Sequence, residues 1–352
     1  MFPEWTWIIG FWIGAAIGSF LNVVIYRLPR GLSVNEPKHS FCPSCKNRLT
    51  WLELIPILSW AIQGGKCRQC GSKVSSRYMV VELVNASLWA GIWWMYLSGS
   101  HTDGDPVRAV AYMLMAACLV AVVFTDLSYY IIPDQINAWI LVIGLVMNLV
   151  MIMQDRPEAW TWGMPSSVAG ALVGIGVLWG IAFLGRLLFR KDAMGHGDIK
   201  LARGTGAVLF PLLAFASFGI AVAVGAVIGI GIALGRRSAE DAAEEEEAED
   251  QAPESLISLL QCGLGYLLCI DVVGLVLEGI NRARGNKALP ELYQRWFGED
   301  PYDYEGIEED PKVDLTTIPF GPYLAAGAIA AVFFEQPITG AIRRYLEQFA
   351  SL

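Results

Sequence analysis

Charged residues are scarce in this sequence. Only 17% of its 352 residues are Asp, Glu, Lys or Arg, whereas 55% are hydrophobic. Much of the net charge of −9 comes from one acidic tract, Glu240 to Glu249. A charge confined to one tract says nothing about nucleic acid. We expect no nucleic-acid partner.

The chain also lacks the marks of a secreted, disulfide-rich domain. Four of its seven cysteines form two close pairs and the others lie in apolar segments, which does not suggest a disulfide scaffold. We expect no cleavable signal peptide, because the first apolar segment is too long and basic residues follow it. Apolar runs of about 20 residues recur, the length that a helix needs to cross a bilayer. The sequence predicts an all-α polytopic protein with about eight transmembrane helices in the lipid bilayer.

The first predicted helix, residues 5–26, is followed by a loop of residues 27–78 that is rich in Lys and Arg and has only two acids, Glu36 and Glu53. Basic loops stay in the cytoplasm. This rule predicts a cytoplasmic loop and an outer N-terminus.

Two C-x-x-C motifs lie in this loop, Cys42-Pro-Ser-Cys45 and Cys67-Arg-Gln-Cys70. Two such motifs allow four thiolates to close a tetrahedron around one zinc ion, and a four-sulfur site without an open position is structural. Disulfides or free thiols are the alternative, and a reducing cytoplasm disfavours disulfides. The loop is therefore predicted to be a zinc module.

The membrane core is predicted to span residues 79–235. Spans are expected at about 79–97, 107–124, 136–153 and 167–184. The run from 201 to 234 is too long for one span, so we expect two helices, with Phe210-Pro211 together with Ser217-Phe-Gly219 offering the break. A last span and tail occupy 318–352. The number of spans predicts that Asp126 and the segment Gly195 to Lys200 lie on the cytoplasmic side. The basic residues that follow the fifth span agree with this orientation.

Asp126 and Asp198 are the candidate reaction centre, because ionisable groups at the ends of membrane helices are costly and usually functional. Asp198 alone would also fit an ordinary helix N-cap, and Asp126 alone a solvated helix end. Asp134 is a rival to Asp126, although its place after a proline is typical of a turn or first-turn acid. His196 reads as a bystander. Lys200 is expected to bond backbone or lipid phosphate, or to tune the neighbouring carboxylate.

Two close carboxylates have a defined chemistry. Because like charges do not both ionise cheaply, one acts as a base on water while the other, protonated, polarises a carbonyl. Gly195 and Gly197 would allow an extended substrate backbone to approach closely. Amide hydrolysis at the membrane boundary is therefore the predicted reaction.

Motifs of a known family are spread over nearly the whole chain: Gly18-Ser-Phe-Leu-Asn-Val-Val-Ile-Tyr-Arg-Leu-Pro29, both C-x-x-C motifs, Arg77-Tyr78 with Val81-Glu82-Leu83, Asp126 with Ile132-Pro133-Asp134, Gly195-x-Gly-Asp198-x-Lys200, and Phe320 to Ala325. In these segments the sequence resembles the bacterial type IV prepilin peptidases, which are GxGD-type membrane aspartic proteases. The insertion described below is the part that the resemblance does not cover.

The resemblance implies that Asp126 and Asp198 are catalytic and that the enzyme lies in the bacterial inner membrane with its active site facing the cytoplasm. It implies removal of the short basic leader of type IV pilin precursors or type II secretion pseudopilins. It further implies N-methylation of the new terminus from S-adenosylmethionine, a task linked with residues 27–78. No glycine-rich cofactor loop is visible, and Glu53 and Glu82 are the candidates for methyl transfer.

Residues 236–317 depart from the family pattern and are expected to form a cytoplasmic insertion. Its acidic tract is expected to be a disordered linker. Its apolar segment, 255–277, is predicted to lie on the membrane surface or to re-enter it, because a full crossing would bring the last span in from the wrong side. Arg203, inside an apolar run, needs an interior partner, with one of the carboxylates as candidate.

Two other classes of protein remain open from the residues alone. A zinc-bearing ion transporter would use the aspartates to bind an ion, but it predicts acids near the bilayer midplane and paired inverted segments, and no repeat is visible. A non-catalytic assembly scaffold is the other alternative.

Overall fold

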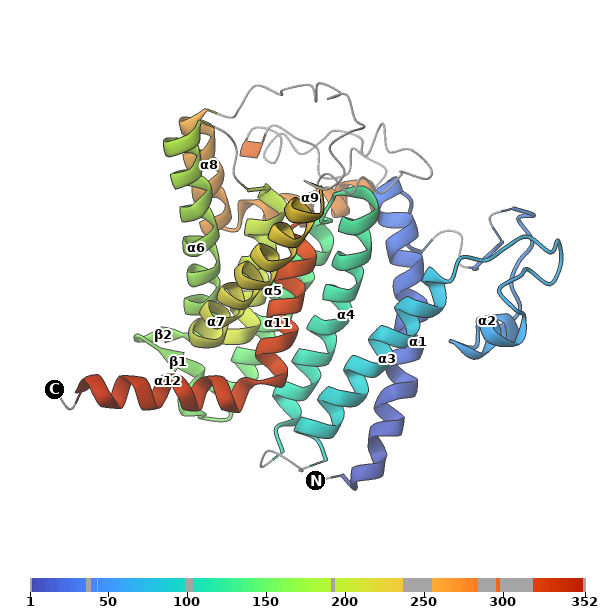
Figure 1. Cartoon of the computed structure of the whole chain (residues 1–352), viewed down its shortest axis with the longest axis horizontal. Helices are drawn as coiled ribbons and strands as arrows, with labels where there is room; N and C mark the ends of the chain where they lie inside the picture. The colour runs from blue at the N-terminus through green and yellow to red at the C-terminus, as the bar shows by residue number, and fades with distance from the viewer. Residues whose placement is uncertain are drawn as a thin grey trace.

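The structure is a computed structural model that describes residues 2–35, 39–42, 44–98, 104–190, 194–236, 255–283, 296–297 and 319–350. The acidic tract and most of the 236–317 insertion lie outside these ranges. The long helices run side by side in one bundle (Figure 1): α1 (Trp7–Arg27), α3 (Arg77–Tyr96), α4 (Pro106–Tyr129), α5 (Asp134–Met153), α6 (Ser166–Phe189), α7 (His196–Arg236) and α11 (Gly321–Phe333).

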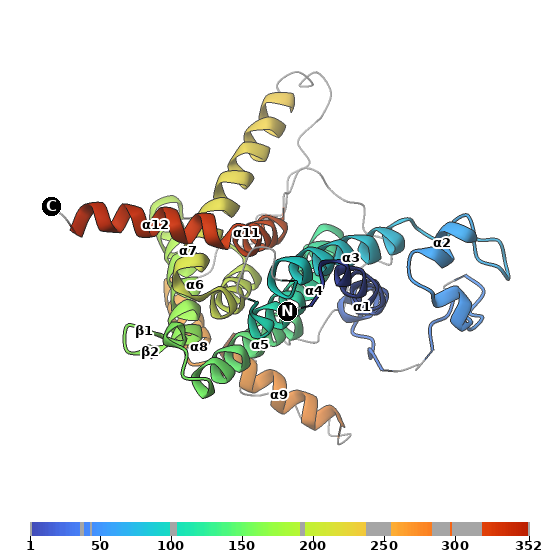
Figure 2. The same ribbon diagram turned by 90° about the horizontal axis from the view of Figure 1, so that it is seen from below.

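Glycines on α1 bring α1 and α3 into close contact. Gly10, Gly14 and Gly18 lie against Trp93, Trp89 and Glu82 respectively. The α3 numbers fall as the α1 numbers rise, so the two helices are antiparallel. The loop between them holds η2 (Leu28–Arg30), η3 (Trp51–Leu54) and α2 (Leu58–Ile62). The part around α2 projects to one side of the bundle in both views (Figure 1, Figure 2).

The prediction of a polytopic helical membrane protein is confirmed. Five helices are long and apolar enough to cross a membrane, or up to seven if each of two bent helix pairs is one span. The expected number of about eight is approximate. The expected number included α3, which is not among the five because residues such as Glu82 and Asn85 make it less apolar. It also included α7 as two spans, whereas α7 is one of the five.

The predicted break at Phe210-Pro211 is confirmed, because Phe210 has φ 62° and ψ 169° inside α7. The chain turns back there. Gly327 of α11 lies against Ser217 and Ala221, and Gly225 of α7 lies against Tyr323. Since α11 numbers fall as α7 numbers rise, the second part of α7 runs antiparallel to α11, toward the end of the bundle where α7 begins.

The first part of α7 is wedged between α6 and α5 through glycines. Gly206 of α7 meets the backbone of Gly170 of α6, and Gly174 of α6 meets the backbone of Ala202 of α7. Gly144 of α5 faces Ala207, and a Cβ there would lie 2.6 Å from the Ala207 carbonyl carbon. Such backbone contact needs glycine, and it fixes the position of the α7 N-terminus relative to its neighbours.

Two bent helix pairs complete the bundle. α8 (Leu256–Leu267) and α9 (Ile270–Ala283) meet at 73°, and the bend lies at Leu268 and Cys269, where φ of Cys269 is 54°. The pair is either a broken span or a re-entrant segment, so the expected re-entry of 255–277 stays a prediction. α11 and α12 (Glu335–Ala350) differ in direction by 81°, and α12 projects sideways from the bundle (Figure 1, Figure 2).

The end of the bundle near α12 is held by a partly buried acid, Glu335. Glu335 accepts hydrogen bonds from Arg108 at 2.5 Å and from the hydroxyl groups of Tyr96 and Tyr112 at 2.7 and 3.3 Å. This polar cluster around Glu335 joins α3, α4 and the start of α12.

A short hairpin, β1 (Trp160–Thr161) with β2 (Met164–Pro165), joins α5 to α6.

We predict that Gly170→Val destabilises the protein, because a side chain there would enter the backbone of Gly206. Overpacking of this kind costs about 1–3 kcal/mol or more. Gly176→Val is the matched control on the same helix, since a Cβ at Gly176 meets nothing within 4 Å. Thermal unfolding in detergent checks this: equal melting temperatures for the two variants would contradict the α6–α7 packing.

Candidate active site and metal site

Asp126 lies in the last turn of α4 and is buried. The helix ends at Tyr129 because Tyr130 takes a left-handed conformation (φ 55°), and its N–H bonds back to the Asp126 carbonyl. Asp126 Oδ2 accepts a hydrogen bond from the Gly321 N–H at 3.0 Å. A Cβ on Gly321 would lie 2.5 Å from that oxygen. The residue at 321 must therefore be glycine for α11 to approach the carboxylate.

Asp198 lies in the first turn of α7, which begins at His196. It is therefore inside the helix and not at its N-cap. Its side chain turns back toward Gly195, whose backbone N–H donates to the carboxylate. Among the described residues, Asp198 Oδ1 is buried without a hydrogen-bond partner. A buried carboxylate oxygen without a partner is costly and is available to a substrate or water.

Ile132 connects the surroundings of the two acids. Its side chain lies 3.2 Å from the Cβ position of Gly197 and 3.0 Å from that of Gly321. The Asn137 side chain donates to the Gly197 carbonyl at 3.5 Å. The carboxyl groups of Asp126 and Asp198 are close enough to interact electrostatically. The structure thus brings Asp126, Asp198, Gly195 and Gly197 together at one end of the bundle, which we call the aspartate end.

Lys200 and Asp134 form a pair of their own. Lys200 Nζ donates to both oxygens of Asp134 at 2.9 and 2.7 Å, joining the start of α7 to the start of α5. Asp134 is the first residue of α5, after Pro133. The two therefore support the site through helix placement, and Lys200 is committed to Asp134 instead of Asp198.

Arg203 has an interior partner, but it is neither Asp126 nor Asp198. Its guanidinium pairs with both oxygens of Asp271, at 2.8 and 2.5 Å, and donates to the Tyr266 carbonyl at 2.9 Å. Asp271 belongs to α9, in the insertion. The expectation that a site carboxylate would pair with Arg203 is wrong, because α9 brings its own acid to the buried cation. His196, expected to be a bystander, shares a 2.7 Å hydrogen bond with the Tyr266 hydroxyl.

The four predicted cysteines gather in one cluster. In each motif the residue after the second cysteine, Lys46 or Gly71, has positive φ and donates its N–H to the carbonyl of the first cysteine at 2.9 Å. The Sγ atoms of all four cysteines lie within 4.8 Å of one another, and those of Cys42 and Cys70 are 3.9 Å apart. A zinc–sulfur bond of about 2.3 Å gives a tetrahedral edge of about 3.8 Å. The donor set therefore fits a zinc ion.

The thiols of this cluster titrate unequally. Burial raises the pKa of Cys42, but hydrogen bonds from the Cys45 backbone and the Ser72 hydroxyl outweigh burial and lower the pKa to about 6. The Asn47 backbone lowers the pKa of Cys45, whereas loss of hydration and hydrogen bonds with the other sulfurs raise it to about 11. Negative charge on one sulfur thus opposes charge on the next until a cation balances it.

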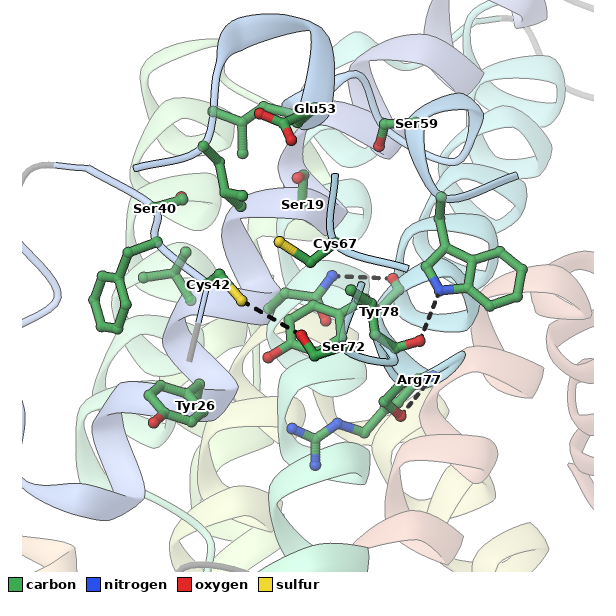
Figure 3. A pocket seen from close by; sticks show the side chains of 18 of the residues that line it. Ser19, Tyr26, Ser40, Cys42, Glu53, Ser59, Cys67, Ser72, Arg77 and Tyr78 are labelled. Atoms are coloured by element: carbon green, nitrogen blue, oxygen red, sulfur yellow. Dashed lines mark hydrogen bonds between the residues drawn. The ribbon is translucent and has the colours of Figure 1, made fainter. Parts of the chain in front are cut away.

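A cavity of about 590 Å³ lies between the cysteine cluster, α1 and α3 (Figure 3). Both methyl-transfer candidates line it. Glu53 accepts hydrogen bonds from the Thr50 backbone and hydroxyl at 2.8 and 2.7 Å, which hold the pKa of Glu53 below its usual range. Glu82 is buried and accepts the Ile57 N–H at 2.7 Å. The lining includes six basic residues: Arg27, Arg30, Lys46, Lys66, Lys73 and Arg77.

The backbone at Ile57 is strained. Ile57 has φ 64° and ψ −53°, and the Leu58 N–H donates to the Pro56 carbonyl at 2.6 Å, so the three residues form a γ-turn. A β-branched residue rarely adopts this conformation. The hydrogen bond from Ile57 to Glu82 holds the turn. Strain of this kind is found at binding sites, where the surrounding structure enforces it.

Several residues beside the site escaped sequence reasoning. Gly321 was known only as part of a segment, and nothing local indicates that its N–H binds Asp126. Tyr266 and Asp271 lie in the segment that departs from the family pattern. The one available signal was Arg203, whose position in an apolar run required some acid nearby.

The fold and site define a helical membrane protein with a paired-aspartate centre at one end and a four-cysteine module after its first helix. Residues 12–96 match the Bacterial Peptidase A24 N-terminal domain, and residues 113–230 match the Type IV leader peptidase family. The chain belongs to the type IV leader peptidase family, and it is an enzyme of that family.

Curated relatives agree with this assignment. A protein of Myxococcus xanthus is 30% identical over 331 residues, which is 91% of this chain and 87% of the relative. One of Aeromonas hydrophila is 36% identical over 245 residues, 62% of this chain and 78% of the relative. One of Neisseria gonorrhoeae is 31% identical over 254 residues, 64% and 83% respectively. Each is named prepilin leader peptidase/N-methyltransferase. No solved structure matches the chain.

We predict about one zinc ion per chain, held by the cysteine cluster. Cys42→Ser should lose most of it, because the three remaining thiolates no longer close a tetrahedron. Elemental analysis of the purified protein measures the metal. Cys118→Ser is the control, since Cys118 lies on α4 outside the cluster. Undiminished zinc in Cys42→Ser would refute the site.

Proposed function

We propose that this enzyme is a membrane aspartic endopeptidase that removes the short basic leader from type IV prepilins or pseudopilins, with Asp126 and Asp198 as its catalytic pair. The observation that carries the proposal is that α4 and α7 bring these two carboxyl groups to one end of an apolar bundle. Curated relatives named prepilin leader peptidase support the choice of substrate.

The proposed reaction follows from two neighbouring carboxyl groups of which one is ionised and one protonated. The carboxylate removes a proton from a water molecule as the water oxygen attacks the scissile carbonyl carbon. The carboxylic acid gives its proton to the carbonyl oxygen. As the tetrahedral intermediate collapses, the C–N bond breaks and a hydroxyl proton returns to the carboxyl group that had given its proton to the carbonyl oxygen, which re-forms the carbonyl. The nitrogen leaves with the proton taken from water, and both carboxyl groups return to their starting states.

The cytoplasmic side is proposed for this centre. Arg30 donates to the Tyr129 hydroxyl at 2.7 Å, and Arg77 donates to the Ser128 hydroxyl at 3.2 Å. The basic residues that flank the cysteine module therefore contact the end of α4 that carries Asp126. Basic segments next to membrane helices stay in the cytoplasm, which supports an active site in a bacterial inner membrane that faces the cytoplasm.

We infer that the second activity, N-methylation of the new terminus, belongs to the cavity beside the cysteine cluster. Its volume suits a nucleoside-sized ligand. Tyr26, Phe41 and Trp60 offer aromatic surfaces, and Glu53 and Glu82 offer acceptors for ribose hydroxyl groups. Bound S-adenosylmethionine would supply an activated methyl group there. The structural zinc ion would hold Cys42 and Cys67, which form part of the cavity wall (Figure 3).

We predict that Asp126→Asn or Asp198→Asn lowers leader cleavage by a factor on the order of 10²–10⁴, since each removes one partner of the acid–base pair. Membranes that contain the variant are incubated with a type IV prepilin, and the cleaved product is quantified by immunoblot. Asp155→Asn is the control, because Asp155 is exposed just after α5, away from Asp126 and Asp198. Normal cleavage by either active-site variant would exclude the mechanism.

Glu82→Gln should separate the two activities. The change keeps the size of the side chain but removes its charge from the cavity, so we expect at least about a tenfold loss of methylation with cleavage unchanged. Mass spectrometry of the mature pilin N-terminus measures both. Glu158→Gln is the control, since Glu158 is exposed in the α5–α6 connection. If cleavage and methylation fell together, the assignment of the cavity to methyl transfer would be wrong.

A further inference from the structure

One face of the first turns of α7 is occupied by the insertion. His196, Lys200 and Arg203 stand at positions i, i+4 and i+7, so they share a face of the helix. Asp198, two residues after His196, points away from that face. Each of the three meets Tyr266: His196 bonds its hydroxyl, Lys200 lies 5.5 Å from its ring centre, and Arg203 donates to its carbonyl. A single residue of α8 thus touches the whole stripe behind Asp198.

The insertion is fixed in this place from several sides. The Arg203–Asp271 pair is buried, with side chains 1% and 5% exposed, and its geometry is bidentate. The Tyr266 ring is stacked on Phe297, with ring centres 5.3 Å apart and planes 8° from parallel. Two turns earlier on α8, Trp179 of α6 donates its indole N–H to the Leu259 carbonyl at 3.1 Å. Breaking a buried ion pair is strongly unfavourable, so α8 and α9 stay docked.

The need for such support comes from the sequence at the start of α7. His196 stands between Gly195 and Gly197, which have no side chain and leave the backbone free to adopt many conformations. Gly195 supplies the N–H that Asp198 accepts. The His196 ring is the only side chain within Gly195-His196-Gly197 that a neighbour can hold. The 2.7 Å hydrogen bond to Tyr266 holds that ring.

We propose that the insertion forms one wall of the peptidase centre and that Tyr266 is a positioning residue, which acts through His196 to keep Asp198 in its reactive orientation. The inference rests on the proposed role of Asp198 in cleavage. It assigns residues 255–283 to the active site of this enzyme, although they stand outside both matched family domains.

Tyr266→Phe tests this inference, because it removes the hydroxyl and keeps the ring on Phe297. Cleavage kinetics of the full-length protein in lipid nanodiscs are measured with a purified type IV prepilin. We expect kcat to fall by about tenfold, as for the loss of one buried hydrogen bond, with KM and melting temperature unchanged. Trp179→Phe is the matched control: it removes a hydrogen bond that docks the same helix elsewhere, and kcat should stay within about twofold.

A double-mutant cycle tests the route through His196. If Tyr266 acts on Asp198 through the His196 ring, Tyr266→Phe should have no further effect on kcat in a His196→Ala background. Additive losses would overturn the proposal, and so would a kcat for Tyr266→Phe equal to that of Trp179→Phe. Asp198→Asn in the same assay keeps the two levels apart: its full activity would overturn the proposed function itself, whereas its inactivity leaves the outcome to the Tyr266 variants.

Discussion

The aspartate end depends on one constraint: a charged side chain inside an apolar bundle needs a partner. Lys200 forms an ion pair with Asp134, and Arg203 forms one with Asp271. Among the described residues, this leaves Asp126 and Asp198 without a cationic partner and with each other as neighbours. Two neighbouring carboxyl groups without a cation do not both ionise cheaply, so the state with one shared proton is favoured over the state with two negative charges. The ion pairs beside the site therefore leave the two aspartates in the condition that the proposed reaction requires.

How much of this follows from sequence depends on the range of each interaction. The break at Phe210-Pro211 and the paired cysteines have local signals, and the common location of Asp126 and Asp198 follows from counting helices. The contacts between residues that are distant in sequence have no such signal. Lys200 meets Asp134 across 66 positions, Arg203 meets Asp271 across 68, and Gly321 meets Asp126 across 195. Such contacts are decided by how helices pack, and sequence reasoning on Arg203 could require an acid without choosing which one.

The two candidate centres share the end of α4. Tyr129 lines the cavity beside the cysteine cluster, and Asp126 lies three residues earlier on the same helix face. One helical turn is about 5.4 Å. Arg30 bonds Tyr129 from the cysteine-module side, so the module is attached where the two sites meet. A pilin terminus released at the aspartates would therefore have a short path to the cavity, consistent with two reactions performed in sequence on one chain end.

Flexibility and precision are in conflict at the start of α7. Glycine at 195 and 197 permits close approach of a peptide backbone, but it also removes the side-chain packing that would hold the Asp198 carboxylate still. The Ile132 side chain covers both Gly197 and Gly321. This contact braces one side of the centre. The other side is braced by Tyr266 through the His196 ring. A glycine-flanked acid thus owes its geometry to residues that are distant in sequence, and a segment inserted far downstream is well placed to supply them.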